Sequence, residues 1–472
     1  MKRMIALVLA AVMVLLIAAC GAKDPTPSTP DPGSNPPAAT PDGDSGTEER
    51  QPQTITFWYG RSEETGAAIE AAVKAFNEGP GAEMKITVEA IYQGTVADAT
   101  TKLRAVLQGD QMDQLPDIME LDATGILDFR NTEYAFTVDE ALAKDTSYDI
   151  SPINEAALKN WSFGGTQWGM PFTITTHIMF YNKTILDAAG VTTPPSTFAE
   201  IIDAAGKLPA ANSNGQKLTA YACLPSSIYL AYWLGQIPGT DAGASYVVNN
   251  RNGRDGLATE LVCDKEGTLL KFLTGWKEMY ESGALLNTGD VLAELFTTEQ
   301  IAIMTGDTAN TVSLLEQIGG RFELGCAMFP RIDENSNQGN QVSGSALCMF
   351  NKKDEAKAMA AWELMKYLTS AEPQADIALA SGYIPCHSGA FNVPAYQEYT
   401  AQYPQLTVGP EQLTLTDPDN VGINVGPSID FYLEVQAQVS NMLENDASPE
   451  DTAAAMSASL NGMLAEYAKA NQ

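Results

Sequence analysis

Residues 53–121 switch repeatedly between two kinds of apolar pattern, and this alternation restricts the fold more than any other feature of the chain. Strands are expected at residues 53–59, 85–92 and 116–121. The segments between these strands carry apolar residues at the i, i+3, i+4 spacing of a helix that buries one face. Strand, helix, strand, helix, strand is the order typical of a parallel α/β sheet. We therefore predict an α/β fold.

Helix patterns recur in the rest of the chain. Thr197 and Glu200 form a capping box before an apolar run, and residues 351–368 carry apolar side chains at helical spacing. Ser448 and Pro449 begin the last predicted helix. Roughly 420 of the 472 residues have the composition of a globular protein, which is enough for two domains.

The first twenty residues have the pattern of a bacterial secretory signal that ends in a lipobox. Two basic residues precede an apolar run at residues 4–17, and the small residues Ala18 and Ala19 precede Cys20. The run is too short to be a stable membrane span. We predict a signal peptide over residues 1–19 and a diacylglycerol on the Cys20 thiol, which with a second acyl group gives stable anchoring. An ordinary signal peptide with a chance cysteine is the alternative.

Residues 20–53 are predicted to be a disordered tether. They are rich in Pro, Asp, Ser, Thr and Gly and have almost no large apolar side chain, so they cannot bury enough surface to offset their chain entropy. The prolines favour an extended chain that could reach on the order of 100 Å at ~3.1 Å per residue. Such a segment would hold a folded body away from a membrane.

The charge of the chain argues against two classes of partner. The formal net charge is −32 and the pI is ≈ 4.2. Such a field opposes binding to nucleic acid and to anionic lipid surfaces. The sequence has neither a phosphate-cradling glycine loop nor EF-hand spacing, so no nucleotide, calcium or other cofactor is expected.

The cysteines after Cys20 are predicted to be buried structural thiols. Their number is odd, so at least one is unpaired or bonded to another molecule. The sequence has no C-x-x-C pair and only two histidines, which argues against a zinc site, and the neighbours Cys386 and His387 support a nucleophile pair only weakly. The cysteines concerned are Cys223, Cys263, Cys326, Cys348 and Cys386.

Short motifs are spread over nearly the whole chain after the signal segment. They are residues 55–59 (ITFWY), 92–95 (YQGT), 115–119 (LPDIM), 168–172 (WGMPF), 179–183 (MFYNK), 194–198 (PPSTF), 302–306 (AIMTG), 342–346 (VSGSA) and 381–385 (SGYIP). Each motif alone has little specificity. Their order and spacing, however, resemble those of the extracellular solute-binding proteins, family 1, of ABC importers, which take up sugars and glycerol phosphates.

The resemblance implies a periplasmic-binding-protein-like type II fold. In that fold two α/β lobes are joined by a hinge of crossing segments, and solute binds in the interlobe cleft. The implied crossings lie near residues 172–176, 321–325 and 370. The lobes expected on this basis are an N-lobe of residues 54–172 and 323–370 and a C-lobe of residues 173–322 and 371–472.

The resemblance also implies a mechanism. Solute contacts both lobes only when the cleft is closed, so binding shifts the equilibrium towards a closed state that a permease can recognise. We predict a monomeric protein without enzymatic activity, anchored through Cys20 on the extracellular face of a bacterial membrane. Its expected partners are a carbohydrate ligand and the transmembrane subunits of an ABC permease; no nucleic acid partner is expected.

Ligand contacts are expected after the matched strands, because open α/β sheets bind ligands at their carboxyl ends. A carbohydrate needs aromatic faces and side chains that form paired hydrogen bonds. The predicted ligand-binding residues are Trp58, Tyr59, Arg61, Gln93, Thr95, Asp122, Thr124, Thr173, Thr175, Asp307, Thr308, Asn310, Gly344, Ser345, Tyr383 and Asn424. Two of them have an open alternative: Trp58 as a core aromatic and Asp122 as a helix cap.

Three departures from the glycerol-3-phosphate branch of the family narrow the expected ligand. Where that branch has Tyr, Glu and the Arg of a G-x-R-x-G motif, this chain has Val96, Ala123 and Asn424. Asparagine cannot supply the charge or the forked donors that arginine offers a phosphate. We therefore predict a neutral carbohydrate, preferably an oligosaccharide, with glycerol-3-phosphate or a phosphodiester as the alternative.

Two other function classes stay open from the sequence. A secreted carbohydrate-active enzyme would need paired carboxylates, and no motif points to such a pair. A receptor that reports sugar to a sensor kinase would use the same closed state as an importer, and the sequence does not separate the two.

Overall fold

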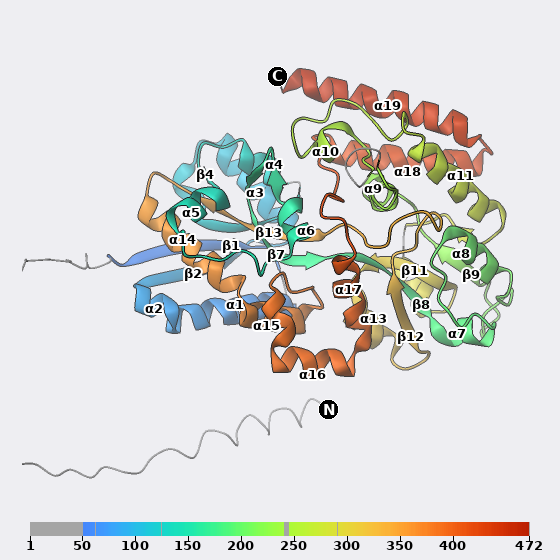
Figure 1. The fold of residues 1–472 in the computed structure, drawn as a ribbon, viewed down its shortest axis with the longest axis horizontal. Helices are drawn as coiled ribbons and strands as arrows, with labels where there is room; N and C mark the ends of the chain where they lie inside the picture. The colour runs from blue at the N-terminus through green and yellow to red at the C-terminus, as the bar shows by residue number, and fades with distance from the viewer. Residues whose placement is uncertain (1–50, 62, 124, 240–244, 290, 472) are drawn as a thin grey trace, which may run out of the picture. The chain divides into compact units, whose positions relative to one another are not determined.

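The structure, a computed structural model, describes residues 51–61, 63–123, 125–239, 245–289 and 291–471. The predicted signal peptide, Cys20 and nearly all of the predicted tether lie outside the described residues. The described residues belong to one compact unit that contains two large sheets. Each sheet is the centre of one α/β lobe (Figure 1).

The first sheet has the strand order β2-β1-β3-β13-β4, and β7 also pairs with β13. Its strands are β1 (Gln53–Tyr59), β2 (Ile86–Tyr92), β3 (Ile118–Leu121), β4 (Ala135–Phe136), β7 (Met170–Thr175) and β13 (Ser343–Phe350). β1 is parallel to β2 and β3, whereas β13 is antiparallel to β3. The predicted order of strand, helix, strand, helix, strand is confirmed.

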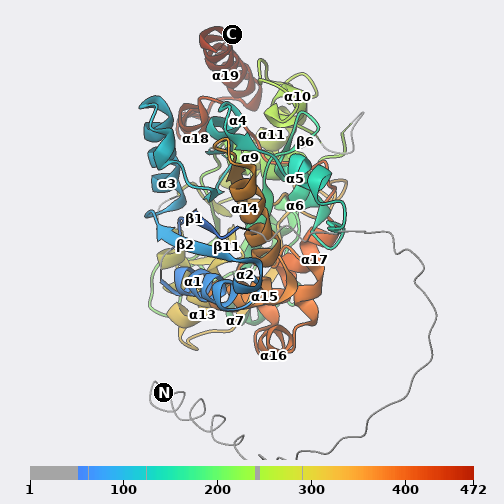
Figure 2. The ribbon, with the colours of Figure 1, turned by 90° about the vertical axis from the view of Figure 1, so that its left-hand side faces the viewer.

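Helices cover both faces of the first sheet, as expected for parallel strands (Figure 2). Ile55, Phe57 and Tyr59 of β1 share a core with α1, α14 and α15, whereas Trp58 faces α3 and α4. The helices of this lobe are α1 (Glu63–Glu78), α2 (Pro80–Met84), α3 (Val96–Gln108), α4 (Gly125–Arg130), α5 (Val138–Lys144), α6 (Glu155–Asn160), α14 (Glu355–Leu368) and α15 (Ala371–Ser381). A two-stranded hairpin of β5 (Ser162–Phe163) and β6 (Thr166–Gln167) follows α6.

The second sheet has the strand order β10-β9-β11-β8-β12. Its strands are β8 (His177–Asn182), β9 (Thr219–Ala222), β10 (Leu285–Leu286), β11 (Ile301–Asp307) and β12 (Leu324–Met328). β9 is parallel to β10 and β11, and β8 is antiparallel to β11 and β12. Two apolar clusters lie on its faces, and the larger is built around Trp233 and Trp276, whose ring centroids are 5.0 Å apart.

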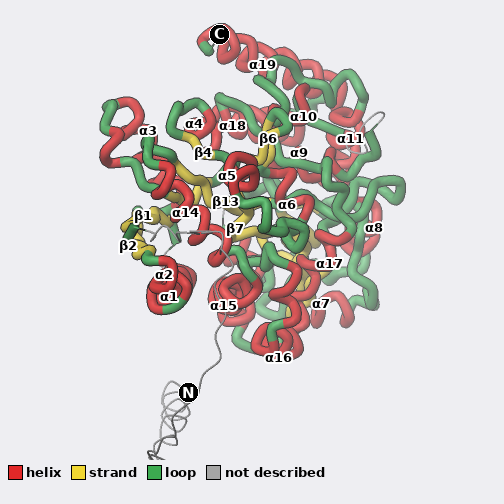
Figure 3. Tube along the Cα trace, turned by 60° about the vertical axis from the view of Figure 1, so that its left-hand side comes forward, coloured by secondary structure: helices red, strands yellow, loops and turns green. Residues whose placement is uncertain are grey.

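Helices also surround the second sheet (Figures 1 and 3). They are α7 (Lys183–Ala188), α8 (Phe198–Ala205), α9 (Ser227–Gly235), α10 (Asn249–Gly253), α11 (Thr268–Glu281), α12 (Leu292–Thr297), α13 (Asn310–Ile318), α17 (Val408–Thr414), α18 (Ser428–Glu444) and α19 (Pro449–Ala470), while α16 (Pro394–Gln402) packs against α15. Thr197 and Ser448 are helix caps as predicted, because each side chain accepts a hydrogen bond from the first turn of its helix. The capping box predicted at Thr197 is only half formed, because the Glu200 carboxylate accepts from Ser196. Among the described residues, none of the helices has the length and apolarity needed to cross a bilayer.

The segments that join the two sheets agree with only one of the implied crossings. Thr176 links β7 of the first sheet to β8 of the second, within the crossing expected at residues 172–176. β12 pairs with β8, so the chain is still in the second sheet near residue 323, and it returns to the first sheet between β12 and β13. Near residue 370 the chain also stays in the first lobe, because α15 packs against α1 and the following Ile384 belongs to the same core. Motif order along the chain does not specify the partner of each strand, which is why these two positions differ.

Gly344 lies at an irregularity in the pairing of β7 with β13. Its φ is +108°, and a Cβ at this position would collide with the carbonyl oxygen of Thr173. We expect Gly344→Ala to lower the free energy of unfolding by about 1–3 kcal/mol, because the left-handed backbone and the collision both disfavour a side chain. Urea denaturation measures this change. The control is Gly462→Ala on α19, where a Cβ meets nothing within 4 Å, and it should stabilise by roughly 0.5–1 kcal/mol. Equal effects of the two substitutions on the free energy of unfolding would contradict the conclusion that position 344 requires glycine.

Candidate functional site

The two sheets meet where β7 continues into β8, and one side of this junction is lined with hydroxyl groups. Thr173 and Thr175 are two residues apart on β7, and Ser343 and Ser345 are two residues apart on the paired strand β13. Residues two apart on a strand point to the same face. Ser343 is paired with Thr175, and the Ser345 hydroxyl lies 2.6 Å from that of Thr173, so the four hydroxyls lie on the same side of the paired strands although the pairing is irregular at Gly344. Each one is hydrogen-bonded to a neighbour from another element.

Glu120 at the end of β3 is the centre of the first-lobe part of the junction. Its fully buried carboxylate accepts hydrogen bonds from Arg61 Nε at 2.7 Å, Gly60 N at 3.1 Å, Thr173 Oγ1 at 2.9 Å and Ser345 Oγ at 2.5 Å. Burial by itself raises the pKa of Glu120, but the charge of Arg61 and these donors outweigh burial and lower it. The carboxylate is therefore ionised and fully partnered.

Arg61 follows β1 and has its charge and its donors engaged within the protein. Besides the contact of its Nε with Glu120, its Nη1 donates to the Tyr383 hydroxyl at 2.5 Å and its Nη2 to Thr173 Oγ1 at 2.8 Å. The guanidinium carbon also lies 4.9 Å from the centroid of the Tyr383 ring. The ion pair leaves this part of the junction without a free cation for an anionic ligand.

Asp307 at the carboxyl end of β11 is the exposed carboxylate of the junction, and 41% of its side chain is accessible. It accepts a hydrogen bond from Thr175 Oγ1 at 2.8 Å, and its Oδ1 lies 3.3 Å from Nδ1 of His177. The His177 ring is buried against Tyr229 and Tyr232, with centroids 5.2 and 4.4 Å away. Burial lowers the pKa of His177, and the charge of Asp307 opposes this only in part. A neutral imidazole therefore stands beside an exposed carboxylate.

The lowered pKa of His177 predicts a pH dependence of stability. The unfolded chain takes up a proton near pH ~6.5, but the folded protein does so only at lower pH, so stability is lost as the pH falls below about 6.5. Asp307 faces the ring from β11, while Tyr229 and Tyr232 face it from α9 with pKa values raised by burial. We expect the free energy of unfolding to fall with acidification by up to about 1.4 kcal/mol more per pH unit than in His177→Gln. Identical slopes in denaturation series between about pH 7.5 and 5.5 would exclude this role.

Several predicted ligand-binding residues meet at this junction, from five separate parts of the chain. They are Arg61, Thr173, Thr175, Asp307, Gly344, Ser345 and Tyr383. Thr173 and Ser345 are fully buried, so here they support Glu120, whereas Arg61, Asp307 and Tyr383 are partly exposed.

Other predicted residues have local structural partners. Trp58 is 5% exposed and packs beneath α3, as in the alternative of a core aromatic, and Tyr59 is 2% exposed and donates to Glu70. Thr95 caps α3, and Asp122 accepts from Gly125 N at 2.8 Å, as in the alternative of a helix cap.

The remaining predicted residues have separate surroundings, and Thr124 is outside the described residues. Gln93 accepts a hydrogen bond from Lys102 at 2.6 Å. Thr308 is buried, and Asn310 is exposed at the start of α13. Asn424 is buried, and its Nδ2 donates to the carbonyl oxygen of Ala123 at 2.9 Å, which joins the segment before α18 to the first lobe.

Comparison with known proteins gives the family. The family model for bacterial extracellular solute-binding proteins matches residues 71–405. The chain belongs to this family. The resemblance seen in the motifs is thereby confirmed.

The curated relatives of this solute-binding protein are distant. The sn-glycerol-3-phosphate-binding periplasmic protein UgpB of Yersinia pseudotuberculosis is 24% identical over 261 residues, which are 54% of this chain and 56% of that protein. UgpB of Escherichia coli O6:K15:H31 is 23% identical over 256 residues, 52% of this chain and 55% of that protein. The chain thus spans about half the length of the curated relatives it matches.

Solved structures confirm the fold. The sugar-binding protein MalE of Xanthomonas citri matches with a TM-score of 0.69 and 17% identity over 88% of this chain and 98% of that one. The cyclic alpha-maltosyl-1,6-maltose binding protein of Arthrobacter globiformis matches with a TM-score of 0.68 and 18% identity, over 88% of this chain and 100% of that one. UgpB of Mycobacterium tuberculosis in complex with glycerophosphocholine matches with a TM-score of 0.67 and 18% identity, over 88% of this chain and 99% of that one. The predicted periplasmic-binding-protein-like type II fold is confirmed.

Five residues of the junction are not among the predicted ligand-binding residues, namely Glu120, His177, Tyr229, Tyr232 and Ser343. Glu120 lies in the run IMEL, which has the pattern of a buried strand, and the signal that could have found it is a single carboxylate among apolar residues. His177, Tyr229 and Tyr232 lie in apolar stretches in which any aromatic side chain is ordinarily a core residue.

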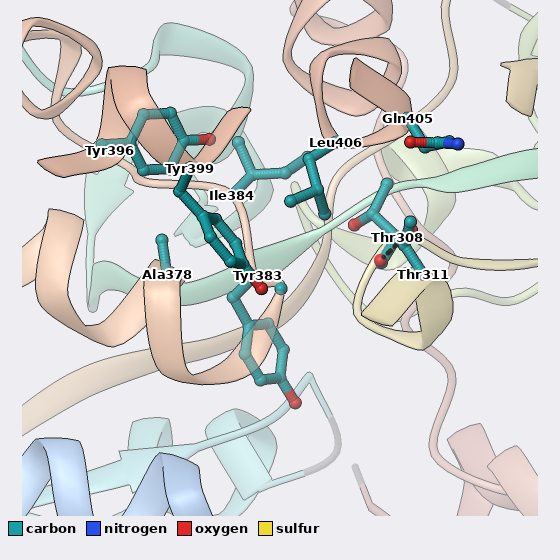
Figure 4. Close-up of a pocket in the computed structure, with 10 residues that line it drawn as sticks. Thr308, Thr311, Ala378, Tyr383, Ile384, Tyr396, Tyr399, Gln405 and Leu406 are labelled. Carbon is teal, nitrogen blue, oxygen red and sulfur yellow. Dashed lines mark hydrogen bonds between the residues drawn. The ribbon is translucent and has the colours of Figure 1, made fainter. Parts of the chain in front are cut away.

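A small cavity lies behind Tyr383, with a volume of about 10 Å³, on the order of one water molecule. Figure 4 shows Thr308 and Thr311 on one side of it and the rings of Tyr396 and Tyr399 on the other. The Tyr383 hydroxyl points away from those two rings, and Arg61 donates to it. The cavity is too small for a sugar, so we treat it as part of the packing around Tyr383.

The five described cysteines of this solute-binding protein are all free. Four are buried and Cys326 is partly buried, and burial raises the pKa of every one of these thiols. A thiol with a raised pKa is a poor nucleophile at neutral pH. The prediction of buried thiols is confirmed for Cys223, Cys263, Cys348 and Cys386.

Proposed function

We propose that this protein is the solute receptor of an ABC importer, that it binds a carbohydrate at the junction between its lobes, and that it passes the carbohydrate to a membrane permease. The observation that carries the proposal is the pairing of charges at the junction. The cation of Arg61 is neutralised by Glu120, while the carboxylate of Asp307 is exposed beside the neutral ring of His177. Such a surface has acceptors for hydroxyl groups, and within the described residues its cation, Arg61, is already paired.

An uncharged ligand fits this chemistry better than a phosphate ester. Sugar hydroxyls can donate to Asp307, and an apolar sugar face can pack against the partly exposed ring of Tyr383. A phosphate would meet the field of Asp307 in a chain of net charge −32. The solved relatives that bind maltose-type sugars support a neutral oligosaccharide, and the UgpB relatives support the alternative of a glycerophosphate.

The remaining parts of the proposal concern position and mode of action. We place the protein outside the bacterial cell as a monomer without catalytic activity, anchored by lipid on Cys20 and held off the membrane by residues 20–53. A carbohydrate that bridges the lobes favours the closed arrangement only through contacts that the open arrangement lacks. The N-lobe and C-lobe are assigned by sheet, with β12 in the C-lobe and α15 in the N-lobe.

A thermal-shift screen of the full chain in detergent tests the proposal. The panel contains mono-, di- and oligosaccharides together with glycerol-3-phosphate. A ligand at a hundredfold excess over its dissociation constant should stabilise the protein by ~2.7 kcal/mol. Stabilisation by at least one neutral saccharide is the expected result, and stabilisation by the phosphate ester alone would refute the proposal.

A further inference from the structure

A hollow of about 350 Å³ lies at one edge of the protein, between α4 of the first lobe and three segments of the second. Those segments are α10 with the loop after it, the stretch before α18, and the end of α19, and Figures 1 and 2 show α4, α10 and α19 along the same edge of the protein. The polar side chains that line the hollow are Arg130, Asn131, Asn424, Tyr467 and Asn471. None of these five carries a carboxylate.

Arg130 is the cation of this hollow, and within the described part of the chain it makes no ion pair and donates no hydrogen bond. Its Nε is buried without a partner. The guanidinium carbon lies 4.4 Å from the centroid of the Phe163 ring and 5.6 Å from that of Trp168, so two aromatic rings fix its position. Burial lowers the pKa of Arg130, and no neighbouring carboxylate raises it. A positioned cation in a chain this acidic is thus left without a counter-charge.

A second cation adds to the positive field. Arg254 lies 4.7 Å from the same Phe163 ring, but its donors are satisfied by Asn160 and by the carbonyl oxygen of Gly422. Arg254 is therefore a structural residue, and its charge adds to the attraction for an anion. Arg130 is the guanidinium that has free donors.

In the other walls of the hollow, two glycines allow segments of the chain to approach each other closely, and Asn424 adds a polar side chain. A Cβ on Gly426 would overlap the Tyr467 ring, and a Cβ on Gly253 would overlap the carbonyl oxygen of Asn424. Asn424 donates to Ala123 of the first lobe, and its Oδ1 is buried without a partner. The hollow thus combines a free guanidinium with an orphaned acceptor that suits a hydroxyl group.

We propose that this hollow binds an oxyanion through Arg130, either a free phosphate or sulfate or the acidic group of a sugar. The planar guanidinium offers forked donors that match two oxygens of such a group. The site differs from the junction around Asp307, so an uncharged sugar unit at the junction and an oxyanion at the hollow are compatible. The lining residues come from both lobes, so a bound anion contacts both.

Isothermal titration of the full chain with inorganic phosphate, sulfate and glucuronate, each in the absence of other ligands, tests the proposal. Binding of phosphate or sulfate identifies a free anion, and binding of glucuronate alone identifies a sugar acid. Arg130→Gln should weaken the binding at least tenfold, and Arg130→Lys, which keeps the charge and loses the fork, should weaken it less. The matched control is Arg104→Gln, because Arg104 on the neighbouring α3 is already paired with Asp128 at 2.7 Å, and it should change binding less than twofold.

Two results would overturn the proposal. One is that none of the three anions binds the wild-type chain; the other is that Arg130→Gln binds them as well as the wild type does. Circular dichroism of each variant checks that it is folded, and Arg130→Lys keeps the test decisive if Arg130→Gln does not fold. Because no neutral saccharide is present, failure here leaves the proposed carbohydrate site untouched, and failure of the saccharide screen leaves this site untouched.

Discussion

Replacing Glu120 with alanine should lower the free energy of unfolding by about 3–5 kcal/mol, because removing one partner of a buried ion pair leaves the other without compensation. Arg61 would lose its carboxylate, and Thr173, Ser345 and the backbone N–H of Gly60 would lose their acceptor. Urea denaturation followed by circular dichroism measures the loss. Because the pKa of Glu120 is lowered, its contribution is present at neutral pH and is lost as the pH falls below about 4.3.

The matched control for Glu120 is Glu355→Ala. Glu355 is also paired with a cation, Lys144, at 2.7 Å, but 65% of its side chain is exposed. An exposed pair of this kind contributes about 0–1 kcal/mol. If Glu120→Ala and Glu355→Ala had the same small effect, the buried network would not be what holds the first-lobe part of the junction together.

Replacing Asp307 with asparagine should weaken carbohydrate binding by roughly ten- to a hundredfold, since a hydrogen bond to a charged group contributes ~1.5–3 kcal/mol. The amide still accepts from Thr175 Oγ1, so the fold should be kept. Titration calorimetry with the saccharide selected in the screen measures the change. Asp187→Asn, on an exposed i,i+4 pair with Lys183 in the same lobe, is the control. An affinity of Asp307→Asn within twofold of the wild type would remove Asp307 from the site.

The order of strands and helices in the first lobe could be predicted from local patterns, because the spacing of apolar residues within each segment distinguishes a strand from a helix. The alternation in β1 even separates the faces, with Phe57 and Tyr59 on one side and Trp58 on the other. The partner of a strand is a property of the whole sheet, however. Residues 323–370 were expected in the N-lobe and residues 371–472 in the C-lobe, whereas β12 belongs to the second sheet and α15 packs in the first lobe.

The residues of the candidate site that could be predicted are those placed at or near the ends of strands. Arg61 and Asp307 follow matched motifs and Tyr383 lies within one, and the structure brings Arg61 and Tyr383 into contact. Glu120 and His177 act through burial and through partners distant in sequence, and neither property is visible in a local pattern. Arg130 is notable because it lacks a carboxylate partner among the described residues, and this lack is visible only in the structure.

The most direct test of the account is a crystal structure of the protein with the saccharide that stabilises it most in the screen. We predict a sugar between the two sheets, with a hydroxyl on the carboxylate of Asp307, a ring face near Tyr383 and contacts to both lobes. A saccharide bound on the outer surface of a single lobe, or a ligand anchored at the junction by a phosphate group, would contradict it.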